Sequence, residues 1–178
     1  MKIVGGLIAL LVLAAVVGAS LTASDALESG RVRPPIQNLV QVTLERGVCF
    51  GRCPDYDITI FVDGRVEYSG RQFVKVEGMR SNNISAVALR QLMDELNRVG
   101  YFGLHDLDTS KMSCENPSTD YPTVTISVRA DGKVKSVKHY RGCGGPTSAL
   151  LSQLEDGIDL LAGTVEWVGT PEERRKLR

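Results

Sequence analysis

Apolar and polar residues alternate in several short segments of the chain. Residues 40–44 (VQVTL) show the pattern first, and a period of two is typical of a strand with one buried face. The same alternation predicts strands at 56–62, 66–68, 73–77, 124–128 and 134–140. An Asp-Gly pair stands at 63–64 and again at 131–132. Asp-Gly favours two-residue hairpin turns, so each pair predicts an antiparallel connection.

Two other segments place apolar residues at helical spacing, i, i+3, i+4 and i+7. Ser85 is a favourable N-cap for the first segment, which ends near Gly100. Pro146 suits the first turn of the second segment, and Gly163 suits its C-cap. The apolar stripes are Leu89, Leu92, Met93 and Leu96, and then Leu150, Leu151, Leu154, Ile158 and Leu161. The element order ββββα-ββα predicts an α+β fold, an antiparallel sheet of about six strands with two helices packed on one face.

The first residues predict export. Lys2 precedes an uncharged apolar run over 3–19, and small residues at 17–19 fit a signal-peptidase site, so we expect a signal peptide at 1–19. An uncleaved anchor is the alternative, because no charge appears over 3–23, a stretch just long enough to span a bilayer. The expected location is extracytoplasmic, periplasmic or secreted, with membrane attachment only if the leader is retained.

The rest of the chain divides by composition. Residues 20–38 are polar and contain Pro34-Pro35, which predicts a linker. The well-patterned strands and helices fill 39–169, the size of a single domain. Residues 170–178 form a short charged tail, for which a solvated helix end is the simplest interpretation.

The charge balance excludes one class of partner. Lysine and arginine together number 21, as do aspartate and glutamate. Binding to nucleic acid or to an anionic membrane surface would show as a clustered excess of positive charge. Neither is expected as a partner, and the expected partner is an unknown protein or another component of the cell envelope.

The four cysteines, Cys49, Cys53, Cys114 and Cys143, predict disulfides, since their number is even and the leader indicates an oxidising compartment. Three pairings are possible. Local geometry favours Cys49–Cys53 with Cys114–Cys143, because the first two share one loop in which Gly51 permits a tight bend. Chain entropy does not select this pairing, because the crossed pairings enclose longer loops.

Two chemical alternatives use the same cysteines. A zinc site takes ligands as close pairs, and Cys49 with Cys53 fits this spacing, but Cys114 and Cys143 are not a second close pair. A thiol redox site normally uses C-x-x-C, whereas the spacing here is C-x-x-x-C. Disulfides are therefore preferred, and no metal or other cofactor is expected.

The segment CFGRCPDY at 49–56 resembles an uncharacterised bacterial family, a domain of unknown function in exported proteins. Its signature is C-x-G-x-C-P-x-Y, followed by an alternating strand and an Asp-Gly turn. Weaker similar patches lie at 73–76, 119–123 and 162–169, so the resemblance spans 39–169. Cys114 and Cys143 are additional to this signature, which makes Cys49–Cys53 the simplest pair. The family carries no activity that could be transferred.

No catalytic motif is present in the sequence: G-x-S-x-G, H-E-x-x-H and P-loop patterns are all missing. His105 is expected to be a surface loop residue, and His139 lies on a predicted strand. The catalytic residues are therefore unknown.

A glycine-rich turn precedes the second helix. Free backbone N–H groups and the helix dipole attract anions at such a place, which makes Arg141, Gly144 and Gly145 candidate anion-binding residues. The simpler interpretation is a turn that reverses the chain and positions Cys143.

The leading hypothesis is a non-enzymatic extracytoplasmic interaction module, stapled by disulfides, that holds its partner on the open sheet face or an edge strand. The reason for this hypothesis is that the sequence shows no set of titratable side chains that would come together at one site. The alternative is an envelope thiol–disulfide or metal-dependent enzyme that uses Cys49 and Cys53. A purely structural role, tethered by an uncleaved leader, is the third hypothesis.

Overall fold

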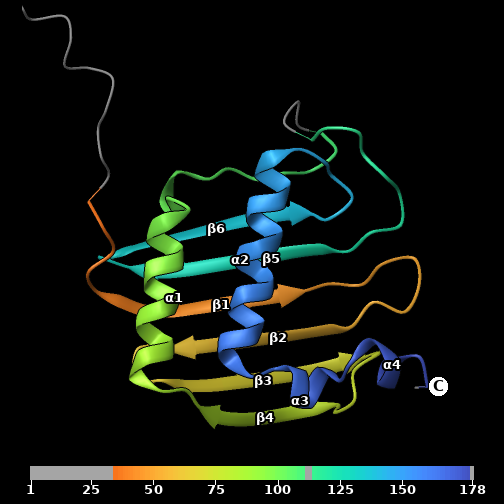
Figure 1. Cartoon of the computed structure of the whole chain (residues 1–178), viewed down its shortest axis with the longest axis horizontal. Helices are drawn as coiled ribbons and strands as arrows, with labels where there is room; N and C mark the ends of the chain where they lie inside the picture. The colour runs from red at the N-terminus through yellow and green to blue at the C-terminus, as the bar shows by residue number, and fades with distance from the viewer. Residues whose placement is uncertain (1–33, 111–113, 177–178) are drawn as a thin grey trace, which may run out of the picture. The chain divides into compact units, whose positions relative to one another are not determined.

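Six strands form one antiparallel sheet in the computed structural model, which describes residues 34–110 and 114–176. The strands are β1 (Leu39–Arg46), β2 (Asp55–Phe61), β3 (Arg65–Gln72), β4 (Gly78–Asn83), β5 (Thr123–Ala130) and β6 (Lys133–Tyr140). Their order across the sheet is β4-β3-β2-β1-β5-β6 (Figure 1). The expected signal peptide at 1–19 and the linker residues up to 33 lie outside the described residues.

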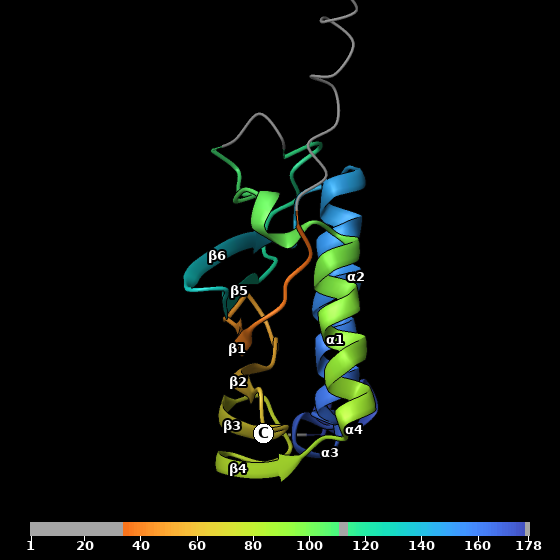
Figure 2. The same cartoon turned by 90° about the vertical axis from the view of Figure 1, so that its left-hand side faces the viewer.

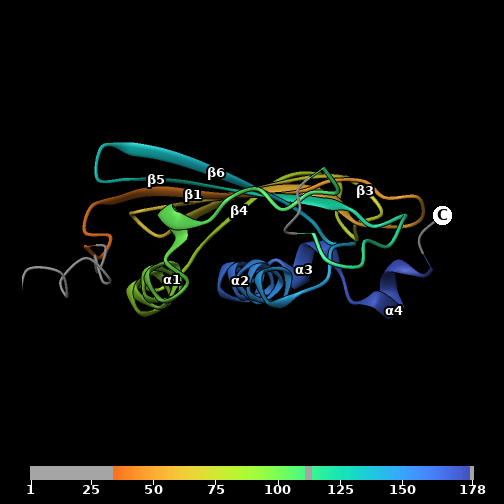
Figure 3. The same cartoon turned by 90° about the horizontal axis from the view of Figure 1, so that it is seen from above.

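Two long helices, α1 (Ala86–Arg98) and α2 (Pro146–Ala162), lie side by side on one face of the sheet (Figures 2 and 3). The shorter elements are η1 (Tyr101–Gly103), α3 (Val165–Val168) and α4 (Pro171–Arg174). The other face of the sheet carries no helix of the described chain (Figure 3). The predicted α+β fold with two helices on one face is confirmed. None of the helices described has the length and hydrophobicity needed to cross a membrane.

The apolar positions of the strands and helices make the core, as their periods predict. Val42 and Leu44 of β1 are fully buried beneath the helices, as are Leu92 and Leu96 of α1. The Ser85 hydroxyl accepts a hydrogen bond from the Ala88 N–H at 3.1 Å, which caps α1. Gly163 ends α2 with φ of 71°, a left-handed conformation that favours glycine.

The strand predicted at 73–77 is wrong, and the fourth strand is β4, at 78–83. Phe73 has φ of 54°, which turns the chain out of the sheet. The N–H groups of Lys75 and Val76 then donate to the carbonyls of Val168 and Trp167, at 3.1 and 2.8 Å. This segment therefore binds α3 and helps to hold the C-terminal residues against the domain.

The end of the expected linker contacts the domain. The Ile36 side chain is buried, and the Ile36 N–H donates to Asn97 Oδ1 at 2.7 Å. The Asn38 N–H donates to Asp131 Oδ1 at 2.9 Å, so residues 37–38 lie against the turn between β5 and β6.

Candidate functional site

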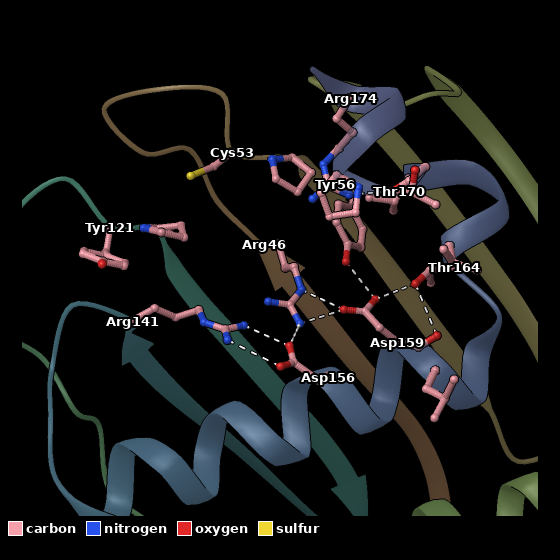
Figure 4. A pocket seen from close by; sticks show the side chains of 17 residues that line it. Arg46, Cys53, Tyr56, Tyr121, Arg141, Asp156, Asp159, Thr164, Thr170 and Arg174 are labelled. Atoms are coloured by element: carbon pink, nitrogen blue, oxygen red, sulfur yellow. Dashed lines mark hydrogen bonds and ion pairs between the residues drawn. The ribbon is translucent and has the colours of Figure 1, made fainter. Parts of the chain in front are cut away.

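A cavity of about 610 Å³ opens at one end of the domain, beside the C-terminal half of α2 (Figure 4). This volume lies within the range of roughly 300–1,000 Å³ that is usual for small-molecule sites. β1, the loops before β2 and β5, and α2 to α4 contribute its lining. The apolar wall residues are Pro54, Tyr121, Pro122, Leu160, Val165 and Val168.

Arg46, at the end of β1, is the central polar residue of the cavity. Its Nε and Nη2 each lie 2.7 Å from Asp159 Oδ2, and its Nη2 donates to Asp156 Oδ1 at 2.9 Å. Burial alone would lower the pKa of Arg46, but the negative charge of Asp159 raises the pKa above its ordinary value. The guanidinium is therefore a fixed cation.

Asp159 is held from its other side by two hydroxyl groups. Tyr56 and Thr164 donate to Asp159 Oδ1 at 2.8 and 2.7 Å. Burial raises the pKa of Tyr56 above its usual value, and the charge of Asp159 raises it further. Tyr56 therefore remains a neutral hydrogen-bond donor.

Arg141, directly after β6, completes the polar part of the cavity. Its Nη1 donates to Asp156 Oδ1 at 3.0 Å and lies 3.3 Å from Glu155 Oε2. Burial opposes ionisation of Asp156, but the hydrogen bond and charge of Arg141, with the charge of Arg46, lower the pKa of Asp156 below its usual value. Asp156 is therefore a carboxylate bridging two guanidinium groups (Figure 4).

A second polar network lies behind the cavity, between β6 and α2. His139 Nδ1 is 2.6 Å from Glu155 Oε1, and His139 Nε2 is 2.8 Å from Ser148 Oγ. All three side chains are buried. The expectation that no titratable groups converge in this domain is therefore wrong.

The order Ser148, His139, Glu155 is that of a catalytic triad, but its protons are placed differently. The Ser148 hydroxyl donates its hydrogen to the Cys143 carbonyl at 2.5 Å, and a carbonyl can only accept. Nε2 of His139 must therefore donate to Ser148 Oγ. Nδ1 faces Glu155 Oε1, and the other oxygen of that carboxylate lies 3.3 Å from Arg141 Nη1.

This arrangement does not support serine catalysis. A general base must have a free nitrogen facing the hydroxyl, and here Nε2 of His139 carries the proton. Ser148 is buried and is absent from the residues that line the cavity. The network is better explained as a hydrogen-bonded link between β6 and α2.

Both favoured disulfides are present, Cys49–Cys53 and Cys114–Cys143. Cys53 lines the cavity, whereas Cys143 is buried near Ser148. Among the described residues there is no free cysteine, nor any group of three or more His, Cys, Asp and Glu placed to hold a metal ion.

The structure separates the three candidate anion-binding residues. Arg141 points to Asp156, in the cavity. The Gly144 N–H donates to the Glu115 carbonyl at 2.6 Å, and Gly145 lies against the Glu115 side chain. An anion site at the turn itself stays a prediction, while Arg141 belongs to the cavity.

The chain is similar to a known protein family. A model described as a domain of unknown function, DUF6438, matches residues 40–162. A search of curated proteins finds no match to this chain.

Proposed function

We propose that this chain, which belongs to the DUF6438 family of domains of unknown function, is a non-enzymatic binding module whose cavity holds a small amphipathic ligand. Two disulfides indicate an oxidising, extracytoplasmic environment. With the apolar leader, they support a periplasmic or secreted protein, with membrane attachment only through an uncleaved N-terminus.

The observation that carries the proposal is the combination of apolar walls with a rigid polar centre. Tyr121, Leu160 and Val165 line the cavity and are also exposed large apolar side chains. Exposed apolar surface that rims a concave site is a common mark of ligand binding. Arg46 and Asp159 fix each other, so the polar groups need little ordering when a ligand binds.

The cavity is a better candidate than the open sheet face named in the leading hypothesis. The side chains on that face pair with each other, as Thr43 does with Thr59 at 3.2 Å and Ser127 with Ser136 at 2.7 Å. These hydroxyl groups therefore already have one partner each within the sheet. The cavity offers concave apolar surface in addition to polar groups.

The fluorescence of Trp167 provides a direct test. Trp167 is the single tryptophan of the chain and precedes Val168, a wall residue. Titrating the oxidised protein with a neutral amphipathic probe, 4-phenylbutanamide, should change this fluorescence saturably. Val165→Lys should weaken the binding at least tenfold. Val87→Lys, at a similarly exposed valine of α1, is the matched control and should leave it unchanged. Equal binding of the probe by the unchanged protein and both variants would rule out the cavity as the binding site.

A thiol–disulfide activity is the second candidate, because Cys53 lines the cavity. It requires Cys49–Cys53 to be reduced by a thiol that leaves Cys114–Cys143 intact. Mild reduction followed by alkylation and peptide mapping decides this. Alkylation of Cys49 and Cys53 alone would favour the enzyme, and equal resistance of both disulfides would favour the binding module.

A further inference from the structure

Around Asp159, the hydrogen bonds of the cavity leave donors rather than acceptors available to a ligand. Both oxygens of Asp159 are occupied, Oδ1 by Tyr56 and Thr164 and Oδ2 by Arg46. Arg46 Nη1, in contrast, has Glu155 Oε2 as its nearest ion-pair partner, at 4.0 Å. Such a surplus of donors favours a ligand that accepts hydrogen bonds.

Arg174 adds to this surplus at the outer wall. Its Nη1 donates to the Gly169 carbonyl, and within the described ranges it has no salt bridge to a carboxylate. Arg174 also lines the cavity. The uncompensated charge of the cavity is therefore positive.

Asp156 differs from the two carboxylates beside it. Its side chain is 60% exposed, compared with 17% for Asp159 and 0% for Glu155. It bridges Arg46 and Arg141 from the cavity side, and this is the position that an external carboxylate would take between two guanidinium groups (Figure 4).

We propose that the cavity binds a small organic carboxylate with an apolar body, and that the ligand carboxylate replaces Asp156 on Arg46 and Arg141. This inference rests on the proposed binding function. The arginines stay in place when Asp156 leaves, since Asp159 holds Arg46 and Glu155 lies beside Arg141.

The apolar body of the ligand then contacts exposed apolar side chains. Tyr121, Leu160 and Val165 line the cavity and would be shielded from water by the ligand. Arg174 also lines the cavity and attracts the anion to it.

The test compares 4-phenylbutanoate with its neutral analogue 4-phenylbutanamide by titration calorimetry. Asp156→Asn keeps the shape of the side chain but removes the competing charge, so the carboxylate should bind about tenfold tighter, a change of about 1.4 kcal/mol. The amide should bind as it does to the unchanged protein. Asp94→Asn, at an exposed acid of α1, controls for the loss of a negative charge elsewhere.

Two further variants test the arginines. Arg141→Gln should remove the preference for the carboxylate over the amide. Arg174 does not contact the buried network. Arg174→Gln should therefore reduce the preference for the carboxylate over the amide severalfold, and this variant tests the arginines if Arg141→Gln does not fold.

The outcomes separate the inference from the proposed function. If the amide binds and the carboxylate binds no better to Asp156→Asn, the carboxylate inference is overturned while the binding function stands. If neither probe binds to any of the proteins, both are overturned. If Asp156→Asn binds the carboxylate more tightly than the unchanged protein does, and binds the amide equally well, both proposals are supported.

Discussion

Glu155 and Asp156 are adjacent on α2, but the Glu155 side chain is fully buried and the Asp156 side chain is 60% exposed. Glu155 faces β6, where it pairs with His139. Asp156 faces the cavity, where it pairs with Arg46 and Arg141. Successive residues of a helix point about 100° apart, so a single step along α2 moves from an enclosed network to an open one.

The two networks differ in what surrounds them. The His139 network is enclosed by protein, and each of its hydrogen bonds ends on another protein group. The cavity network also contains carboxylate and hydroxyl groups, but it includes the 60% exposed side chain of Asp156 and ends at solvent. Burial therefore makes one set of charges structural and leaves the other available to a ligand.

The largest effect is expected when the buried carboxylate is removed. Glu155→Ala removes the buried carboxylate that pairs with His139 and lies beside Arg141, which should lower the free energy of unfolding by about 3–5 kcal/mol. Asp156→Ala is the matched control on the same helix and should cost less than about 1 kcal/mol, because its ion pairs are open to water. Urea unfolding at neutral pH measures both.

A double variant sharpens this prediction. His139→Leu with Glu155→Leu replaces both buried polar partners by apolar side chains, and it should recover part of the stability lost in Glu155→Ala. Equal losses in Glu155→Ala and Asp156→Ala would show that the two networks do not differ as described.

The two disulfides should differ next. The bridges close loops with sequence separations of 29 and 4 residues. Chain entropy gives about 3.6 kcal/mol for Cys114–Cys143 and about 2 kcal/mol for Cys49–Cys53. We expect paired alanine substitutions to lower stability in that order. Ligand binding should show the reverse order, because Cys53 lines the cavity. A larger binding defect from loss of Cys114–Cys143 would contradict the account.

Tyr56→Phe removes one donor from the cavity network. The hydroxyl bonds a carboxylate, Asp159, so its loss should cost about 1.5 kcal/mol. Tyr121→Phe provides the matched control, since its hydroxyl has no hydrogen-bond partner in the structure as described. Thermal unfolding of the two variants should therefore separate them, and identical midpoints would be evidence against a stabilising role of Tyr56.

The smallest effect concerns pH at the outer wall of the cavity. The Lys75 ammonium and the Thr170 backbone N–H lower the pKa of Glu173 to about 2 from an ordinary value of 4.5. A lowered carboxylate pKa stabilises the folded state above the ordinary value, and this contribution is lost as the pH falls from 4.5 towards 2. NMR signals of the Thr170 amide should follow this titration, and Glu173→Gln should abolish it.

The periods of the sequence predicted the sheet, both helices and their apolar faces, because each of these depends on local alternation. The fourth strand was misplaced because Phe73 adopts a left-handed backbone conformation, which its residue type does not predict. The segment at 73–77 then pairs with α3, a contact between residues far apart in the chain.

The buried network had a signal that could have been used. His139 follows Val137 with a period of two, on the buried face of β6, and Glu155 lies between Leu151 and Ile158 on the apolar face of α2. Charged or titratable residues at two core positions predict a buried polar pair. The sequence pattern does not predict which two residues come into contact. The cavity could not be predicted, because its walls come from loops and short helices without a periodic pattern.

The most direct test of the account is an NMR titration of the oxidised protein with 4-phenylbutanoate, followed through backbone amide shifts. The account predicts saturable shifts at Leu160, Val165 and Val168, around the cavity, with little change on the open sheet face. Shifts centred on Thr43, Thr59 and Ser127 of that face would contradict it.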